Sequence, residues 1–141
     1  MAIKQISVFV ENRTGKLADV IEALGAAGID LRALSIADTA DFGILRIIVS
    51  KPEEVANLLR ERGYVIRVTE VLAVSLPDTP GSLAKVLRAL SDARVNLEYT
   101  YAFVSYIKDR AYVVLRVENN ERAAEALLKQ GAVFAEEKDL Y

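Results

Sequence analysis

The sequence predicts an α+β fold made of two consecutive βαββαβ units, and three observations support this prediction. Short apolar stretches typical of strands and longer apolar stripes at helical spacing follow one another in the order βαββαβ. The same order then recurs along the 141-residue chain, with Gly15 matching Gly81 (81 − 15 = 66) and Gly63 matching Gly131 (131 − 63 = 68). A glycine turn opens the first helix of both units. We therefore expect two domains, residues 1–69 and 70–141.

The first unit opens with a strand and a helix. Apolar residues at positions 6, 8 and 10 alternate with their neighbours, as in a strand that buries one face. An apolar stripe at i, i+3, i+4 and i+7 then predicts a helix: Leu17, Val20, Ile21 and Leu24. Gly25 and Gly28 are expected to end this helix.

Three strands and one helix are expected to complete the first unit. Residues 29–36 and 42–49 read as strands, joined by a polar turn over 38–41. Ser50 and Glu53 have the spacing of a capping box, which predicts a helix from Val55 to about Arg62, closed by Gly63. Residues 64–68 form the expected fourth strand.

The second unit repeats this pattern closely enough to indicate duplication. Its first helical stripe matches that of the first unit residue for residue: Leu83, Val86, Leu87 and Leu90. The offset grows by two residues, and we assign the insertion to the loop at residues 105–110. No linker rich in Pro, Gly or Ser separates the units, so a rigid connection is expected. A sheet covered by helices on one face leaves its other face and its edges open, which favours side-by-side or back-to-back packing and a homodimer.

Composition narrows the possible functions. The net charge of −2 argues against a general binder of nucleic acids or anionic membranes. No apolar stretch approaches the ~20 residues needed to span a bilayer. The chain contains neither Cys nor His, which removes disulfides, thiol catalysis and the commonest general base. We expect a cytoplasmic protein with no cofactor and no metal.

Two similar turns form the motif on which the functional prediction depends. Residues 78–83 (Asp-Thr-Pro-Gly-Ser-Leu) and residues 12–17 (Asn-Arg-Thr-Gly-Lys-Leu) both connect a strand to a helix. In the second copy, Thr79 is expected to cap the helix and Pro80 to take its first position. Turns of this kind leave backbone N–H groups unpaired, and such groups favour a carboxylate or a phosphate. Backbone physics alone allows an anion there without requiring one, and the glycines equally suit tight turns that bind nothing.

The repeat, together with a turn of the form Asp-x-Pro-Gly-Ser-Leu, resembles the ACT domain. The whole chain is similar to a tandem pair of ACT domains, each a ferredoxin-like unit with an antiparallel sheet and helices on one face. The second copy carries the pattern through Asp78, Pro80, Gly81 and Leu83. The first copy departs from it, because Thr14 occupies the proline position.

The resemblance implies a non-enzymatic regulatory protein that binds an amino acid or a related carboxylate at interfaces between domains. The ligand carboxylate would meet the turn amides, Asn12 and Asp78 would hold its amino group, and the second strands would form the facing wall. The implied ligand contacts are Asn12, Thr14, Gly15, Lys16, Leu17, Leu34, Ser35, Ile36, Asp78, Pro80, Gly81, Ser82, Leu83 and Tyr101. ACT domains are usually fused to the enzyme that they regulate, whereas this chain would be a free-standing sensor or a subunit that acts on a partner enzyme or pathway in trans.

Two other functions stay open. One is a structural module whose turns are empty. The other is a binder of single-stranded RNA, because the strand at 99–103 carries alternating aromatic residues, Tyr106 and Tyr112 follow, and RNA-recognition domains share the βαββαβ order. We favour an interface role for these rings, since the first copy has small residues at the matching positions: Ala33, Ser35 and Ala37. Carboxylates at 38–41 and 136–139 read as solvated surface groups, and no residue set resembles a catalytic triad.

Overall fold

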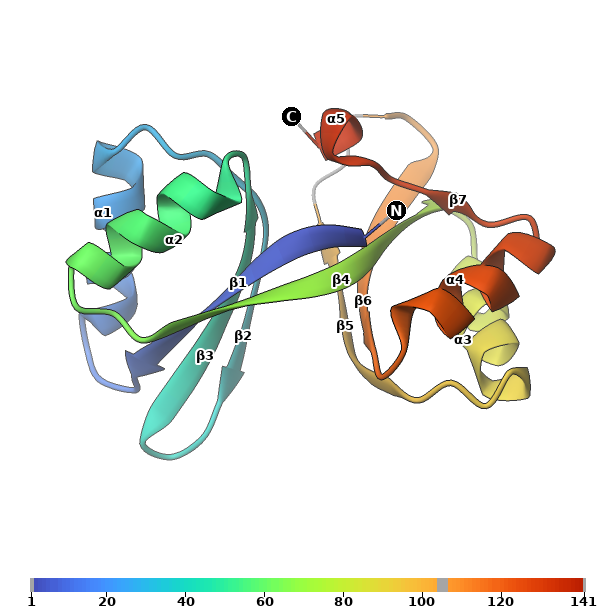
Figure 1. Ribbon diagram of the computed structural model, residues 1–141, viewed down its shortest axis with the longest axis horizontal. Coiled ribbons are helices and arrows are strands. Elements are labelled where there is room, and N and C mark those ends of the chain that lie inside the picture. Colours follow the sequence, from blue (N-terminus) through green and yellow to red (C-terminus); the bar gives the residue numbers. More distant parts are fainter. Residues whose placement is uncertain (1, 104–106, 141) are drawn as a thin grey trace. The chain divides into compact units, whose positions relative to one another are not determined.

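A computed structural model describes residues 2–103 and 107–140 and confirms the α+β class with its repeated βαββαβ order (Figure 1). The elements are β1 (Ala2–Glu11), α1 (Lys16–Ala26), β2 (Leu31–Asp38), β3 (Phe42–Val49), α2 (Pro52–Glu61), β4 (Ile66–Pro77), α3 (Ser82–Asp92), β5 (Leu97–Phe103), β6 (Arg110–Val117), α4 (Asn120–Lys129), β7 (Val133–Phe134) and α5 (Glu137–Leu140).

The chain divides into two compact units. The first unit comprises residues 4–69, and the second comprises residues 70–140 together with Ala2 and Ile3. Strand β4 is shared, because its residues 66–69 belong to the first unit and its residues 70–77 to the second. The expected domain boundaries, 1–69 and 70–141, stay a prediction.

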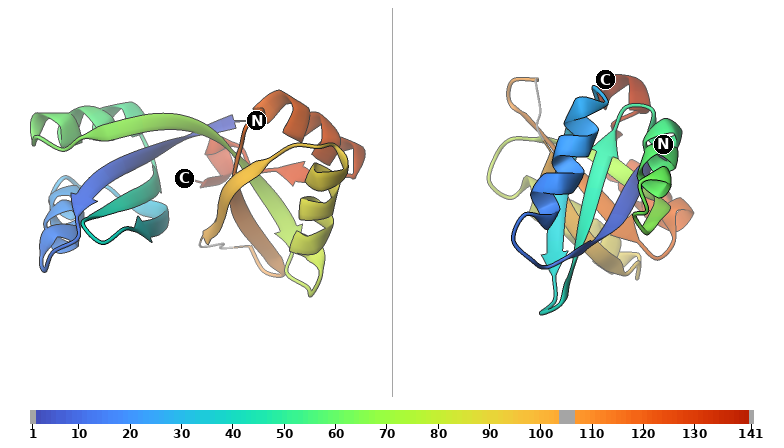
Figure 2. Two further views of the ribbon diagram at one scale, coloured as in Figure 1. Left: turned by 90° about the horizontal axis from the view of Figure 1, so that it is seen from below. Right: turned by 90° about the vertical axis from the view of Figure 1, so that its left-hand side faces the viewer.

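In the first unit the strand order is β2-β3-β1-β4, and the antiparallel pairs β2–β3 and β3–β1 place Leu34 opposite Ile47 and Val8 opposite Leu45. Alternate residues of β1 and β3 point to one face and are buried against both helices. Helix α1 contributes Val20 and Leu24 to this core, and helix α2 contributes Val55, Ala56 and Leu59. Both helices therefore cover the same face of the sheet, as expected (Figure 2).

The second unit has the order β5-β6-β4-β7, which corresponds strand by strand to that of the first unit. Thr100 pairs with Leu115, which matches the Leu34–Ile47 pair of the first unit, so the two hairpins share one register. The offset between the copies is 66 on β5 (100 − 34) and 68 on β6 (115 − 47), so it changes between these two strands, as the sequence predicts. The expected insertion at 105–110 lies partly outside the described residues.

Four features of the elements differ from the sequence predictions. The expected strand at 64–68 and the apolar run at 72–76 belong to one strand, β4, which spans Ile66–Pro77, because no turn-forming residue interrupts them. Strand β7 has only two residues, and the short helix α5 was not predicted. Gly25 lies inside α1 rather than at its end, and the chain leaves the helix through Gly28, whose φ is +73°.

The predicted capping box before α2 is wrong. Its N-cap is Lys51, at a left-handed φ of 54°, and among the described residues no side chain caps the helix. Pro52 at the first helical position explains the difference, because proline lacks an N–H that would need an acceptor. The helix therefore starts without the Ser50 and Glu53 side chains.

Candidate functional site

The two glycine turns have nearly identical backbone geometry. Gly15 has φ 86° and ψ −13°, and Gly81 has φ 90° and ψ −10°. In each turn the N–H after the glycine donates to the carbonyl three residues earlier, from Lys16 to Arg13 and from Ser82 to Thr79. These are type II β-turns, in which the third residue needs a positive φ, and glycine adopts it without strain.

The predicted helix start in the second copy is wrong. Helix α3 begins at Ser82 with Gly81 as its N-cap, and no side chain of the described residues caps it. Pro80 is instead the second residue of the turn, where its fixed φ suits type II geometry. The Thr79 hydroxyl forms a hydrogen bond with the Ser82 hydroxyl, at 2.9 Å between the oxygens, and not with a helical N–H.

The turns leave the backbone amides at the two helix starts without partners. Within the described part of the chain, the N–H groups of Leu17 and Ala18 meet no acceptor, and the same holds for Leu83 and Ala84. Such groups at a helix N-terminus carry partial positive charge, which favours a carboxylate. The expected donor groups are therefore present in both copies.

Each turn is attached to the neighbouring hairpin of its own unit. The Asn12 N–H donates to the Asp41 carbonyl at 3.0 Å, and the Asp78 N–H donates to the Asp109 carbonyl at 2.9 Å. The two bonds are equivalent, because their donors are 66 residues apart (78 − 12) and their acceptors 68 residues apart (109 − 41), the same offsets as in the hairpins. They hold the residue before each glycine turn in place.

The side chains of Asn12 and Asp78 are in different situations. The Asn12 amide nitrogen donates to the Thr39 carbonyl at 3.1 Å, which leaves its oxygen as the group available to a ligand amine. No hydrogen bond or ion pair within the described residues engages the exposed carboxylate of Asp78. A carboxylate pairs more strongly with an ammonium than an amide oxygen does, so Asp78 is the better candidate.

The other predicted ligand contacts lie on the turns and on the edge strands. Thr14, Gly15, Pro80 and Gly81 are exposed, and Lys16 and Ser82 are half-buried. Further along each unit, the edge strands carry the expected wall residues: Leu34 and Ile36, which are exposed, with half-buried Ser35 on β2, and half-buried Tyr101 on β5.

The rings of the second unit pack in pairs. The ring of Tyr101 stacks on that of Tyr99, with centroids 6.5 Å apart, and Phe103 packs against Tyr112 at 5.1 Å. Whether they form an interface stays a prediction, and Tyr106 lies outside the described residues.

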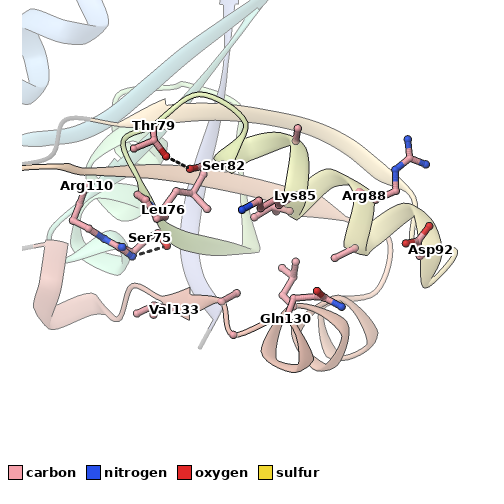
Figure 3. Close-up of a pocket in the computed structure, with 17 residues that line it drawn as sticks. Ser75, Leu76, Thr79, Ser82, Lys85, Arg88, Asp92, Arg110, Gln130 and Val133 are labelled. Carbon is pink, nitrogen blue, oxygen red and sulfur yellow. Dashed lines mark hydrogen bonds between the residues drawn. The ribbon is translucent and has the colours of Figure 1, made fainter.

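A cavity of about 720 Å³ lies inside the second unit, beside its glycine turn (Figure 3). It is bounded by the end of β4, by α3, by the end of α4 and by β7. Of the predicted ligand contacts, only Ser82 lines it. Sequence analysis missed this cavity, because its walls come from residues far apart along the chain.

A family model for the ACT domain pair matches residues 1–141 of the chain. The chain belongs to this family. Membership of the ACT domain pair family confirms the predicted resemblance, and it accounts for the duplicated units and for the glycine turn before α1 and α3. It also supports the expected regulatory role in its general form.

Solved structures carry the same fold. Protein BT0572 from Bacteroides thetaiotaomicron is 41% identical, with a TM-score of 0.92 over 100% of this chain and 96% of that one. The ligand-free regulatory subunit of aspartate kinase from Thermus thermophilus is 22% identical, with a TM-score of 0.64 over 89% and 91%. The corresponding subunit from Thermus flavus is 20% identical, with a TM-score of 0.62 over 89% and 90%. No match to a curated protein was found.

None of the helices in the described residues has the length and apolar character that a membrane crossing requires. No group of three or more acidic side chains lies close enough together in the described ranges to hold a metal ion.

Proposed function

We propose that this ACT domain pair senses a small amino acid, or a related carboxylate metabolite, at its glycine turns and regulates a partner enzyme in trans. The observation that carries the proposal is the pair of left-handed glycine turns, each followed by backbone amides without acceptors in the described chain. The proposal includes a cytoplasmic homodimer as the working form.

Family membership supports the regulatory part of this proposal. The Thermus thermophilus neighbour is a regulatory subunit of aspartate kinase, solved in a ligand-free form. Its likeness to this chain is one of fold, and we extend the regulatory role to this chain as part of the proposal.

In the proposed mechanism, the two charged groups of the ligand bind to different groups at the turn. The ligand carboxylate accepts hydrogen bonds from the amides of Leu83 and Ala84, and the ligand ammonium pairs with Asp78. In the first unit, Asn12 occupies the position of Asp78, so the ligand ammonium meets an amide oxygen and is bound more weakly there. A bound ligand fixes the turns. It can change the activity of a partner enzyme only if it binds one conformation of this protein more tightly than another.

Isothermal titration calorimetry of the full chain against the twenty amino acids tests the proposal. We expect at least one amino acid to bind and to raise the melting temperature, since binding to the folded state stabilises it by RT ln(1 + [L]/Kd). Replacement of Gly81 by Val should weaken binding by about tenfold or more, because a β-branched residue resists the left-handed φ.

A matched variant separates ligand binding from backbone strain. Gly63 also has a positive φ, +85°, and a Cβ at either glycine would meet no described atom within 4 Å. The Gly63→Val protein should therefore be destabilised like Gly81→Val but keep its affinity for the amino acid. If no amino acid binds at millimolar concentration, the sensing proposal fails and a structural module is the better interpretation.

A further inference from the structure

The cavity of the second unit has the composition of a ligand site rather than of a packing defect. The apolar part of its lining includes the buried side chains of Leu76, Val86, Ala89 and Leu127, and most of its other lining residues are exposed or half-buried. Its volume, about 720 Å³, is in the range of small-molecule pockets, which combine apolar walls with a few convergent polar groups. The polar groups therefore decide which ligand chemistry fits.

Arg110 is the best-placed polar group. It is half-buried at the start of β6, where its Nε donates to the Ser75 hydroxyl at 2.9 Å and a terminal nitrogen donates to the Ser75 carbonyl at 3.0 Å. Among the described residues, no carboxylate lies within ion-pair distance of its guanidinium. Two bonds to Ser75 fix the position of the guanidinium and leave other N–H donors for a ligand.

Lys85 adds a second positive charge to the same cavity. It extends from α3 toward the end of β4, whereas the guanidinium of Arg88 turns away from α4 (Figure 3). The ammonium of Lys85 has no carboxylate partner in the described part of the chain. Among the described residues that line the cavity, Asp92 at the end of α3 is the one acidic residue, against Lys85, Arg88 and Arg110, so this lining is net positive.

The first unit shows that the fold does not require these charges. At the matching positions it has Asp19 for Lys85 (85 − 66 = 19) and Phe42 for Arg110 (110 − 68 = 42). It also has Tyr64 for Ala132 (132 − 68 = 64), and Tyr64 packs against the core of the first unit. A bulky ring in one copy and an open, cationic space in the other indicate a role specific to the second unit.

We propose that this cavity binds a small organic anion, with its carboxylate or phosphate held by Arg110 and Lys85 and its apolar body against Leu76, Val86 and Leu127. The site is separate from amino-acid binding at the glycine turns, because it needs neither the Asp78 carboxylate nor an ammonium on the ligand. Arg110 offers the planar donor pair that suits carboxylates and phosphates.

Calorimetry of the full chain with three probes of similar shape tests the ligand class. Isocaproate carries a carboxylate, isoamyl phosphate carries a phosphate, and isocaproamide is neutral. We expect one or both anions to bind, with the tighter one identifying the anionic group, and the amide to bind at least about tenfold more weakly. Equal binding of isocaproamide, or no binding of either anion, would overturn the proposal.

Substitutions test whether the cavity is the place of binding. Arg110→Gln should weaken anion binding by about tenfold or more, because it removes the charge and the paired donors. Arg116→Gln is the matched control, since Arg116 lies on the same strand but pairs with Glu98 at 3.0 Å and does not line the cavity. It should leave the affinity unchanged.

A second variant keeps the test decisive if Arg110→Gln does not fold, since Arg110 connects β6 to β4 through Ser75. Lys85→Gln alters an exposed position on α3 and should fold normally, while weakening anion binding several-fold. Anion binding that is unchanged in Lys85→Gln and in every folded Arg110 variant contradicts the assignment of this site.

Discussion

The two units differ least in backbone and most in the side chains that line their outer surfaces. Both begin their first helix at a left-handed glycine, and both anchor the preceding turn to a hairpin carbonyl, that of Asp41 or of Asp109. The helix surface after that turn carries Asp19 and Glu22 in the first unit, against Lys85 and Arg88 in the second. Duplication has thus preserved the turn and reversed the charge beside it.

This contrast separates what the fold needs from what a ligand needs. Gly15 and Gly81 set the left-handed turn in both copies, and matched core positions such as Leu24 and Leu90 are apolar in both, because changing them costs stability in either unit. Surface charges next to the turn are free to change, because solvated charges contribute little to folding. Folding stability therefore does not set these charges, whereas it does constrain the core, and the equivalence of the two cores can be tested directly.

Substitution of a matched core residue in each unit should have the largest effect. Leu24 of α1 and Leu90 of α3 occupy equivalent positions, and each is 1% exposed. Replacing either with Ala should lower the free energy of unfolding by about 2–5 kcal/mol, as lost burial and a new cavity predict. Urea denaturation followed by circular dichroism measures both. A loss confined to one variant would show that the two cores are not equivalent.

Helix capping should distinguish the units by a smaller amount. Asn119, the N-cap of α4, accepts a hydrogen bond from the Arg122 N–H at 3.0 Å, whereas its counterpart Lys51 caps nothing among the described residues. Asn119→Ala should cost about 1 kcal/mol of unfolding free energy. Lys51→Ala should change it by less than about 0.5 kcal/mol. Equal costs in urea denaturation would mean that the Asn119 bond contributes nothing.

Local patterns were enough to predict most of the fold. The stripes of α1 and α3 and the strand β3 were recognised because periodic burial leaves a strong signal in the sequence. Helix starts were predicted poorly, since glycine or proline geometry replaced the side-chain caps expected from Ser50 and Thr79. The repeat predicted a last strand in the second unit but not the short length of β7, because pairing across a sheet depends on distant residues.

The candidate site was less accessible to sequence analysis. The turn motif located the exposed amides, because a glycine with positive φ has a local signature. The cavity is lined by Ser75, Lys85 and Arg110 from three different elements, and no local pattern encodes that. The alignment of the two copies did contain two signals. Lys85 replaces Asp19, which reverses the charge, and Ala132 replaces the larger Tyr64.

The smallest expected difference concerns an ion pair found in the first unit. Lys4 and Glu53 form a hydrogen-bonded ion pair, and the second unit has Glu70 at the position of Lys4 (4 + 66 = 70), so it cannot form the same pair. The bond to Lys4, followed by its positive charge, lowers the pKa of Glu53 below its usual value of 4.5. A lowered pKa in the folded state means that the pair stabilises the fold above pH 4.5, and that this contribution is lost as the pH falls through the folded-state value.

Glu53→Gln should therefore lower the unfolding free energy slightly at neutral pH, and the difference from the unaltered protein should shrink as the pH falls below 4.5. Urea denaturation at a series of pH values measures this difference, and high salt should reduce it because both groups are exposed. Lys4→Gln provides the control, since Glu53→Gln should have no further effect once the partner charge is gone. A difference that persists unchanged at low pH, or in the Lys4→Gln background, would assign the effect of Glu53 to something other than this pair, and the contrast between the units would lose its electrostatic part.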